Sequence, residues 1–343
     1  MFKNQIITYV FLSMLPILFI ADIILGSVDI PLSIFHDILL HKNIDSIWYN
    51  IIFEMRLPRA TVAIITGIAL PISGLLMQTL FRNPLADPYV LGISTGASLG
   101  VAVFSLTGGV AASSLLGGLG LFGSLGTVLS AFIGSSLVMI IIVYVAPKVY
   151  DAASLLIIGI MLGSITSAVV SVLQYFANPQ EVHAFILWTF GSFSGIRWNE
   201  IIIIIACLIP CLFIIFVYHK SLNALLLGDN YARGLGIKIK SLRLIIIICA
   251  SILASILTAF TGPIGFIGMT VPHMARYIFK TTNHKILIIQ SALIGANLML
   301  ICDIISQMPG YESTLPINTV TAIFGAPVVI FVIYSGRKSR IQY

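Results

Sequence analysis

The stretch from Arg56 to Gly100 limits the folds open to this chain more than any other. Two apolar segments of membrane-spanning length flank the polar sequence FRNPLADP at 81–88. In hydrocarbon, the backbone groups that its two prolines leave without helical partners would go unsatisfied. We therefore expect this polar segment to lie at a membrane interface or inside protein.

The scarcity of charge points to lipid as the solvent. Only 9% of the residues are charged and the mean hydropathy is +1.08, whereas ordinary soluble domains carry about 25% charged residues. A soluble chain of 343 residues could not cover its surface with so few charges. The net charge of +6 is better explained by cytoplasmic loops than by nucleic-acid binding.

Apolar runs of about 20 residues, the length that crosses a bilayer, predict an all-α integral membrane protein. We expect one transmembrane domain over 1–343, with a retained first span and a glycine-rich turn at 107–126. The ten expected spans cover 6–25, 60–80, 91–107, 120–146, 153–174, 201–218, 243–261, 264–280, 286–306 and 317–335.

Lysine and arginine predict the orientation, because they gather in cytoplasmic loops. With a cytoplasmic N-terminus and alternating spans, 14 of the 18 basic residues fall inside the cell. The four outside are Lys42, Arg56, Arg59 and Arg197. Both termini are then cytoplasmic in a multi-pass protein of the cytoplasmic (inner) membrane.

Two stripes of small residues recur at four-residue spacing. One is Gly92, Gly96 and Gly100, and the other begins at Gly159. Such stripes let helices approach closely in lipid. A second interpretation, compatible with the first, is that the fifth span lines a pathway, with candidate lining residues Gly163, Ser164, Ser167 and Ser171.

The cytoplasmic segment 221–242 predicts two short helices that form a rigid knob. Asp229 can cap the second helix, and glycines at 234 and 236 end it. Alanine, leucine and glycine alternate with the charges, as a protein-contact surface requires. The alternative is a solvated basic loop attracted to anionic lipid head groups.

Several motifs in order resemble one family, the iron-complex/cobalamin permeases of ABC importers. The motifs are RLPR at 56–59, NPLADPYVLGISTGASLG at 83–100, LLLGDNYARGLGI at 225–237, GPIGFIGMTVPHMAR at 262–276 and LPINTVTAIFGAPVVI at 315–330. The resemblance implies a type II importer permease of about ten helices per subunit, working as a homodimer. Two ATPase subunits would bind inside and one substrate-binding protein outside.

ATP and Mg would be bound by those partners, so we expect no cofactor, metal or catalytic residue in this chain. It has no G-x-x-x-x-G-K-[ST] phosphate loop. Its cysteines are expected to be buried and inert, and His273 to be structural.

The resemblance also assigns candidate residues. The ATPase-coupling loop would comprise Leu226, Leu227, Gly228, Asp229, Asn230, Tyr231, Ala232, Arg233, Gly234, Leu235 and Gly236. Arg56 and Arg59 would be two fixed charges that dock the binding protein; ordinary interfacial anchoring is the alternative. In the cobalamin permease a further arginine follows the aspartate of the ninth span, where this chain has Gln307.

The sequence VYDAASLL at 149–156 resembles the family's cytoplasmic gate, formed by Asp151, Ala152, Ala153 and Ser154. A plain helix start with Asp151 as N-cap is compatible with this role. Asp22 and Asp303, inside apolar runs near the outer ends of their spans, are either functional or exposed at the interface.

The function expected is translocation of an iron complex, a ferric siderophore or haem, driven by ATP hydrolysis in the partner subunits. A cobalamin importer is the alternative within the family. An ion-coupled secondary transporter would want charge near mid-membrane, which spans three, four and ten lack, and a membrane-embedded enzyme would want clustered ligands. The segment 177–195 is expected to face the binding protein or the upper cavity.

Overall fold

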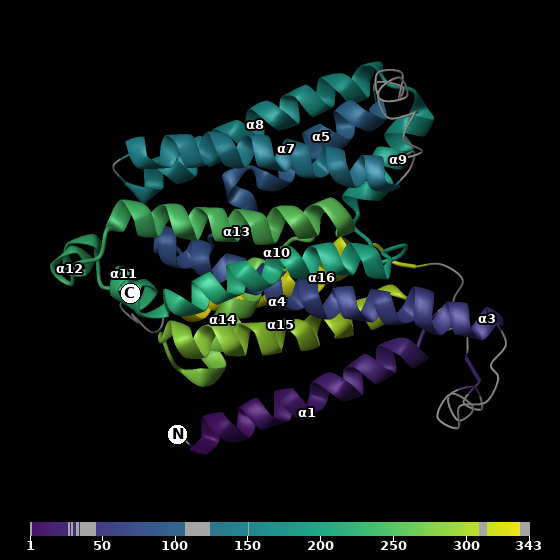
Figure 1. Ribbon diagram of the computed structural model, residues 1–343, viewed down its shortest axis with the longest axis horizontal. Helices are drawn as coiled ribbons and strands as arrows, with labels where there is room; N and C mark the ends of the chain where they lie inside the picture. The colour runs from purple at the N-terminus through teal and green to yellow at the C-terminus, as the bar shows by residue number, and fades with distance from the viewer. Residues whose placement is uncertain are drawn as a thin grey trace.

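The computed structural model is a bundle of helices that run roughly along its longest axis (Figure 1). It describes residues 2–26, 28, 30–31, 34, 46–106, 124–149, 151–308 and 314–336, and this part contains no β-strand. The elements are α1 (Phe2–Ile24), α3 (Ser46–Tyr49), the π-helix η1 (Asn50–Arg56), α4 (Leu57–Phe81), the 3-10 turn η2 (Pro88–Leu91), α5 (Ile93–Leu106), α7 (Ser124–Val145), η4 (Ala146–Lys148), α8 (Ala152–Phe176), α9 (Pro179–Thr189), α10 (Trp198–Val217), α11 (His219–Leu226), α12 (Asp229–Gly234), α13 (Ile239–Thr261), α14 (Ile267–Phe279), α15 (His284–Ser306) and α16 (Ile317–Gly336).

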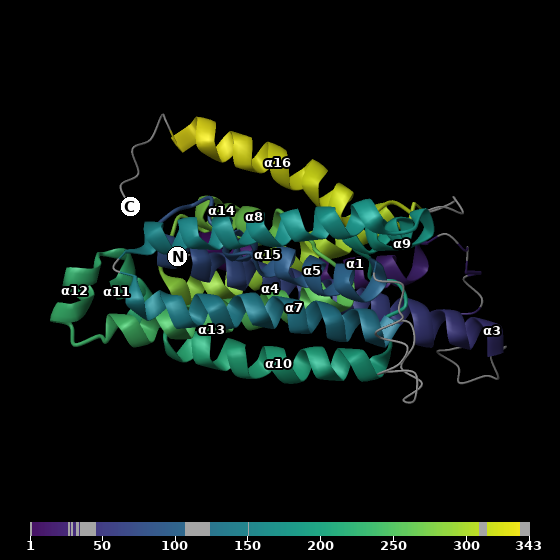
Figure 2. The same ribbon diagram turned by 90° about the horizontal axis from the view of Figure 1, so that it is seen from above.

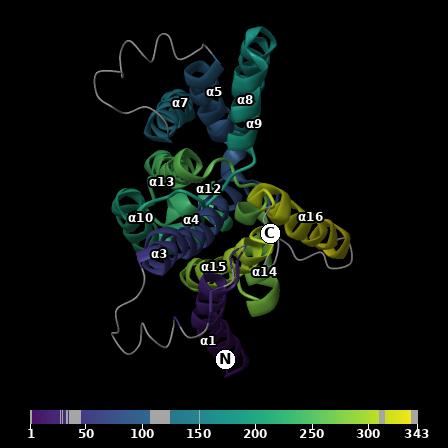
Figure 3. The same ribbon diagram turned by 90° about the vertical axis from the view of Figure 1, so that its right-hand side faces the viewer.

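Helix α4 lies at the centre of the bundle, as the end-on view shows (Figure 3). Of its 25 residues, 19 are buried, because α13, α14 and α15 all pack against it. A helix buried on every side cannot use bulky side chains throughout, and α4 carries small or hydroxyl residues at Thr66, Gly67, Ser73 and Gly74. These positions set how closely its neighbours approach.

Backbone contacts between glycines hold the neighbours of α4 in place. A Cβ added at Gly67 would lie 2.3 Å from the Gly295 carbonyl oxygen of α15, and one at Gly74 would lie 1.8 Å from the Gly268 carbonyl oxygen of α14. The predicted glycine stripe on α5 packs in the same way, since a Cβ at Gly100 would lie 1.9 Å from the Ser130 carbonyl oxygen of α7. The helix-packing interpretation of that stripe is therefore confirmed for this contact.

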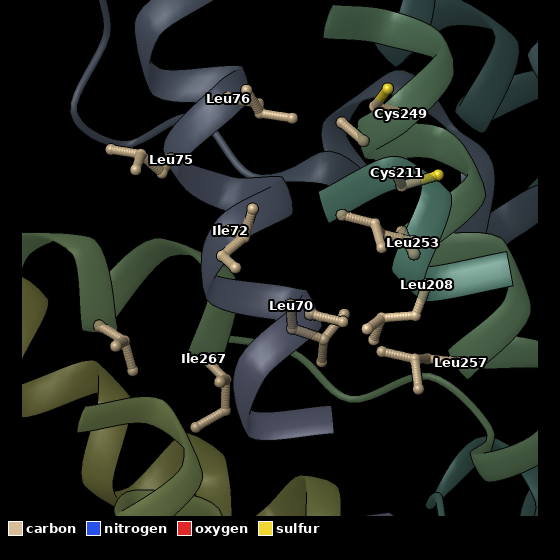
Figure 4. Packing of buried hydrophobic residues seen from close by; sticks show 14 of the residues in the cluster. Leu70, Ile72, Leu75, Leu76, Leu208, Cys211, Cys249, Leu253, Leu257 and Ile267 are labelled. Carbon is tan, nitrogen blue, oxygen red and sulfur yellow. The ribbon is translucent and has the colours of Figure 1, made fainter. Parts of the chain in front are cut away.

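Aliphatic side chains fill the space between α4, α10 and α13 (Figure 4). Leu70 and Leu76 of α4 face Leu253 of α13, with Cys211 and Cys249 nearby in the same cluster. All four cysteines are free thiols, three of them buried and Cys207 partly so. They pack as small apolar residues, as the sequence predicted.

Within the described part of the chain, seven helices are long and apolar enough to cross a membrane. The other three predicted spans correspond to α16, which has 20 residues, and to two shorter helices: α5 has 14 residues and α14 has 13. At 1.5 Å per residue these two are about 20 Å long, less than the roughly 30 Å of hydrocarbon. The number of crossings stays a prediction. Most of the predicted turn at 107–126 lies outside the described residues.

The end of the polar segment before α5 is buried in protein at 86–88, whereas Arg82 and Leu85 earlier in the segment are exposed. The Asp87 carboxylate accepts hydrogen bonds from the backbone N–H groups of Tyr89 (3.0 Å) and Met269, the latter in the first turn of α14. His273 Nε2 lies 2.6 Å from the Pro84 carbonyl oxygen, which fits its predicted structural role. Of the two locations expected from the sequence, the inside of the protein is observed for 86–88, and the membrane interface stays a prediction for the exposed part.

The break between α13 and α14 lies inside the bundle, near the middle of α4. Gly262 and Phe266 have positive φ angles of 74° and 68°. The backbone N–H of Ile264 donates to the Tyr89 hydroxyl (3.3 Å), and that of Gly265 donates to the Asn318 side chain (3.0 Å). These partners satisfy two of the backbone N–H groups that a broken helix leaves without helical bonds.

The substitution Gly74→Ala tests the close contact between α4 and α14. Because the new methyl group would meet backbone rather than a flexible side chain, we expect a loss of about 3 kcal/mol or more in the free energy of unfolding. The apparent melting temperature in detergent measures it. Gly234→Ala is the control, since nothing lies within 4 Å of the added carbon; equal melting temperatures for the two variants would contradict the packing.

Candidate functional site

The predicted knob is present as two short helices at one end of the bundle (Figure 1). Helix α11 ends at Leu226 and α12 begins at Asp229, with Gly228 between them at a φ of 115°. Gly236 follows α12 with a φ of 81°. Asp229 is the first helical residue rather than the predicted N-cap, which is Gly228.

Asp229 fastens α12 to two longer helices. Its Oδ2 accepts a hydrogen bond from Arg243 Nη2 of α13 at 2.6 Å, and its Oδ1 pairs with Arg82, the C-cap of α4. The carboxylate therefore joins the knob to the central helix at the point where the polar segment begins. Sequence reasoning placed Asp229 in the coupling loop but did not identify these partners, which lie 147 and 14 residues away.

His284 fastens α11 in the same way. Its Nε2 lies 2.7 Å from the Thr79 hydroxyl of α4, and its Nδ1 lies 2.8 Å from the Asn223 side-chain oxygen of α11. The same oxygen accepts the His284 backbone N–H at 2.8 Å. Nothing in the sequence pattern singled out His284, because its partners come from two distant segments, α4 and α11.

The outer face of the knob is apolar. Leu227, Tyr231 and Leu235 are 67%, 52% and 60% exposed, whereas Ala232 is fully buried against the bundle. Large apolar side chains on a short, well-anchored element are typical of a protein-contact surface.

The predicted gate residues form the start of α8. Asp151 is the N-cap: its Oδ1 accepts the Ser154 backbone N–H at 2.7 Å and its Oδ2 accepts the Ser154 hydroxyl at 2.8 Å. The Ser154 backbone N–H lowers the pKa of Asp151, so this exposed carboxylate stays ionised. Ala152 is half-buried and Ala153 is exposed.

Three of the four predicted pathway residues border an open groove of about 490 Å³ where the start of α5 meets α8. Ser171 does not border it, although it lies exposed on the same helix. No charged side chain lines the groove. The lining residues are Tyr89, Val90, Gly92, Thr95, Gly159, Ile160, Gly163, Ser164 and Ser167.

Arg56 and Arg59, the two fixed charges predicted to dock a binding protein, both have partners within this chain. Arg56 is buried and donates to the carbonyl oxygens of Ile23 and Ile24, both at 2.7 Å. These belong to the last turn of α1, whose carbonyl groups lack helical partners. Arg59, with a side chain 13% exposed, pairs with Asp303 of α15 at 2.7 Å.

Asp22 and Asp303 are buried, so the expectation of interfacial exposure is wrong. Gln307 joins them: its side-chain N–H group donates to Asp22 Oδ1 at 2.9 Å and to Asp303 Oδ2 at 3.2 Å. These three residues and Arg59 tie α1, α4 and α15 together at the end opposite the knob. Docking of a binding protein at this end stays a prediction.

The chain is similar to known transport proteins over most of its length. The FecCD transport family matches residues 14–335. The vitamin B12 import system permease protein BtuC of Escherichia coli O9:H4 (strain HS) is 34% identical over 288 residues, which cover 84% of each chain. The protein of the same name from Salmonella newport (strain SL254) gives the same values.

Solved structures resemble this fold as well. A metal-chelate type ABC transporter in an inward-facing conformation superposes with a TM-score of 0.82 at 27% identity, covering 96% of this chain and 99% of that one. PsaBC from Streptococcus pneumoniae, in complex with Fab, has a TM-score of 0.51 at 18% identity over 80% of this chain and 88% of that one. The second match supports the fold alone.

The substitution Arg59→Gln tests the buried ion pair. It would leave Asp22 and Asp303 buried with no guanidinium beside them, and we expect it to lower the free energy of unfolding by about 3 kcal/mol. Thermal unfolding in detergent measures this loss. Adding Asp303→Asn should restore part of it.

Arg197→Gln is the matched control, because Arg197 is an exposed arginine outside this ion pair. We expect a change within about 0.5 kcal/mol. Equal melting temperatures for the Arg59 and Arg197 variants would show that the Arg59–Asp303 pair does not stabilise the fold.

Proposed function

Because the chain belongs to the FecCD transport family and is the permease of an ABC importer, we propose that it carries a metal chelate across the cytoplasmic membrane. Ferric siderophores, haem and cobalamin are the candidate substrates. Similarity to the BtuC relatives supports cobalamin as the substrate, and membership of the family supports an iron complex equally strongly. All three are metal ions enclosed in an organic ligand, so one kind of pathway can serve them.

The bonds between the knob and α4 are the observation that carries this proposal. An importer whose ATPases are separate subunits needs a rigid element that transmits their movement to the membrane helices. Helices α11 and α12 supply it, since Asp229 and His284 bond them to both ends of the last turn of α4 and to its neighbours. The exposed Leu227, Tyr231 and Leu235 would contact the ATPase.

The groove between α5 and α8 has the character of a passage rather than a binding site. Hydroxyl groups and small or aliphatic side chains line it, and no fixed charge would hold a charged chelate tightly. Weak contact suits transport because a substrate that bound strongly would not leave. The absence of charge from this lining also argues against an ion-coupled transporter, which needs a titratable or ion-binding group along its route.

A homodimer would complete the passage. Helices α8 and α16 lie on the side of the bundle away from α10 (Figures 2 and 3), and both expose apolar side chains, among them Ile165 at 62% and Ile330 at 67%. A second copy packed there would cover these residues and enclose the groove. In this assembly the starts of the two α8 helices, at Ala152 and Ala153, would form the gate.

Movement follows from differential binding. ATP would stabilise one arrangement of the two ATPases, and the knob would shift with them. Through Arg82 and Thr79 that shift would reach the end of α4 and the polar segment that leads to the groove. A binding protein on the opposite face would deliver the substrate.

ATPase activity in lipid nanodiscs tests the proposal. The permease is co-expressed with its candidate ATPase and assayed with binding protein loaded in turn with ferric siderophore, haem and cobalamin. Stimulation by one loaded form identifies the substrate. Transport by the purified permease without any ATPase would exclude this function and favour ion coupling.

The substitution Asp229→Asn tests the coupling role of the knob. Loss of both ion pairs should leave the ATPase bound through its apolar contacts but reduce substrate-stimulated hydrolysis by about fivefold or more, the lower range of allosteric coupling. Lys285→Gln is the control, an exposed residue at the same end outside the knob. If Asp229→Asn retains full stimulation, the Arg82–Asp229–Arg243 connection does not transmit the movement.

A further inference from the structure

A small basic pocket lies at the knob end of the bundle, where η4 follows α7 and where α12 and α13 meet. Its volume is about 230 Å³. Four of its lining residues are basic and none is acidic. The lining residues are Ala146, Pro147, Lys148, Val149, Arg233, Ile239, Lys240, Arg243 and Leu244.

Positive charge in this pocket exceeds what the protein neutralises. Asp229 forms an ion pair with Arg243, and the same carboxylate also forms an ion pair with Arg82, so one negative charge is shared by two arginines. Among the described residues, neither Arg233 nor Lys240 has an ion pair or a side-chain hydrogen bond. The pocket therefore holds uncompensated cations that favour an anionic ligand.

Lys148 lines the pocket from η4, directly after α7. Its Nζ lies 3.4 Å from the centre of the Tyr144 ring, a cation–π contact that fixes a flexible side chain. The other nearby carboxylate, Asp151, is occupied by the backbone and hydroxyl of Ser154. Lys148 is thus held beside the cavity without a carboxylate partner of its own.

An apolar stripe leads away from the pocket along α7. Leu137, Ile140 and Tyr144 are 57%, 59% and 66% exposed, and their spacing places them on one face of the helix. The floor of the pocket is apolar as well, formed by Ala146, Ile239 and Leu244. A ligand with a charged head and a hydrocarbon tail matches both features.

We propose that this pocket binds the phosphate group of one anionic phospholipid, with Lys148, Arg233, Lys240 and Arg243 around the phosphate and an acyl chain along the α7 stripe. Arginine donates paired hydrogen bonds to phosphate oxygens, and lysine adds point charge. Basic pockets between membrane helices are suited to anionic head groups. The pocket does not include the apolar knob residues Leu227, Tyr231 and Leu235; Arg233 is the pocket residue that also belongs to the predicted coupling loop.

This site does not depend on the proposed transport function. It concerns only the lipid that surrounds the protein, and its ligand would keep α7, α12 and α13 together at the level of the head groups. A bound lipid at this place would also stabilise the end of α12, which has only six residues and no stability alone.

Native mass spectrometry of the full chain tests the proposal. The protein is released from nanodiscs of neutral phosphatidylcholine in which roughly one lipid in ten is phosphatidylglycerol. The lipids retained per protein are counted at a series of phosphatidylglycerol concentrations. We expect one phosphatidylglycerol to bind in preference to phosphatidylcholine. Lys148→Ala/Lys240→Ala should weaken it by about fivefold for each charge removed.

Lys220→Ala/Lys285→Ala is the matched control, since it removes two exposed lysines at the same end outside the pocket. Equal weakening by both double variants would mean general attraction to the surface and would overturn the proposal. To exclude misfolding, both variants must melt at the temperature of the parent in neutral detergent. If Lys148→Ala/Lys240→Ala melts at a lower temperature than the parent, the single variant Lys240→Gln is titrated with phosphatidylglycerol instead. An affinity for phosphatidylglycerol equal to that of the parent would overturn the site.

Two further arms distinguish the source of the phosphate. Inorganic phosphate added in neutral detergent should raise the melting temperature much less than phosphatidylglycerol does, because it lacks the acyl chain; an equal rise would mean that the pocket takes free phosphate and would overturn the lipid assignment. Addition of the ATPase subunit should leave the lipid bound. Displacement of the lipid by the ATPase would assign the pocket to a carboxylate of the ATPase instead.

Discussion

Close backbone contact around α4 is the constraint on which the rest of the structure depends. In lipid, apolar side chains gain little by leaving one hydrocarbon surface for another, so helices associate through packing and hydrogen bonds. Gly67 and Gly74 bring α15 and α14 against α4 with no side chain between them. Once these three helices are fixed, the polar segment before α5 and the knob both have defined places, because each is bonded to one or more of them.

Hydrogen bonds and ion pairs fix the relative positions of helices at places where packing alone would not determine them. At the knob end, Asp229 and His284 join α4 to α11, α12 and α13. In the middle, Asp87 fixes the polar segment to the first turn of α14. At the far end, Asp303 holds Arg59. One central helix therefore contacts every part that a movement would have to pass through.

The sequence predicts those structural features that arise from a repeated pattern of residues or from an interruption of one. Apolar runs located the helices, the glycines at 228 and 236 marked the ends of α12, and the prolines and Asp87 marked a segment that lipid could not surround. The motifs supplied the family and the coupling loop. The motifs could not predict which side chains bond to each other across the fold. Arg59 and Asp303 are 244 residues apart in the sequence, and His284 and Thr79 are 205 residues apart. An arginine at the end of an apolar span looks the same whether it awaits a partner protein or already holds an aspartate.

That ambiguity changes how the end of the bundle opposite the knob is understood. The related motif in the family suggests a docking surface made of arginines. Here Arg56 donates hydrogen bonds to the last carbonyl groups of α1, and Arg59 is neutralised by Asp303. Gln307 carries no charge and bonds to two aspartates. Opening these bonds to engage another protein would expose buried carboxylates, and that cost must be offset by the new contacts. A binding protein that docks on this face would then do more than deliver substrate, because releasing Arg59 from Asp303 loosens α4 from α15 at the end opposite the ATPases. Docking outside and ATP binding inside would thus act on the two ends of the same helix.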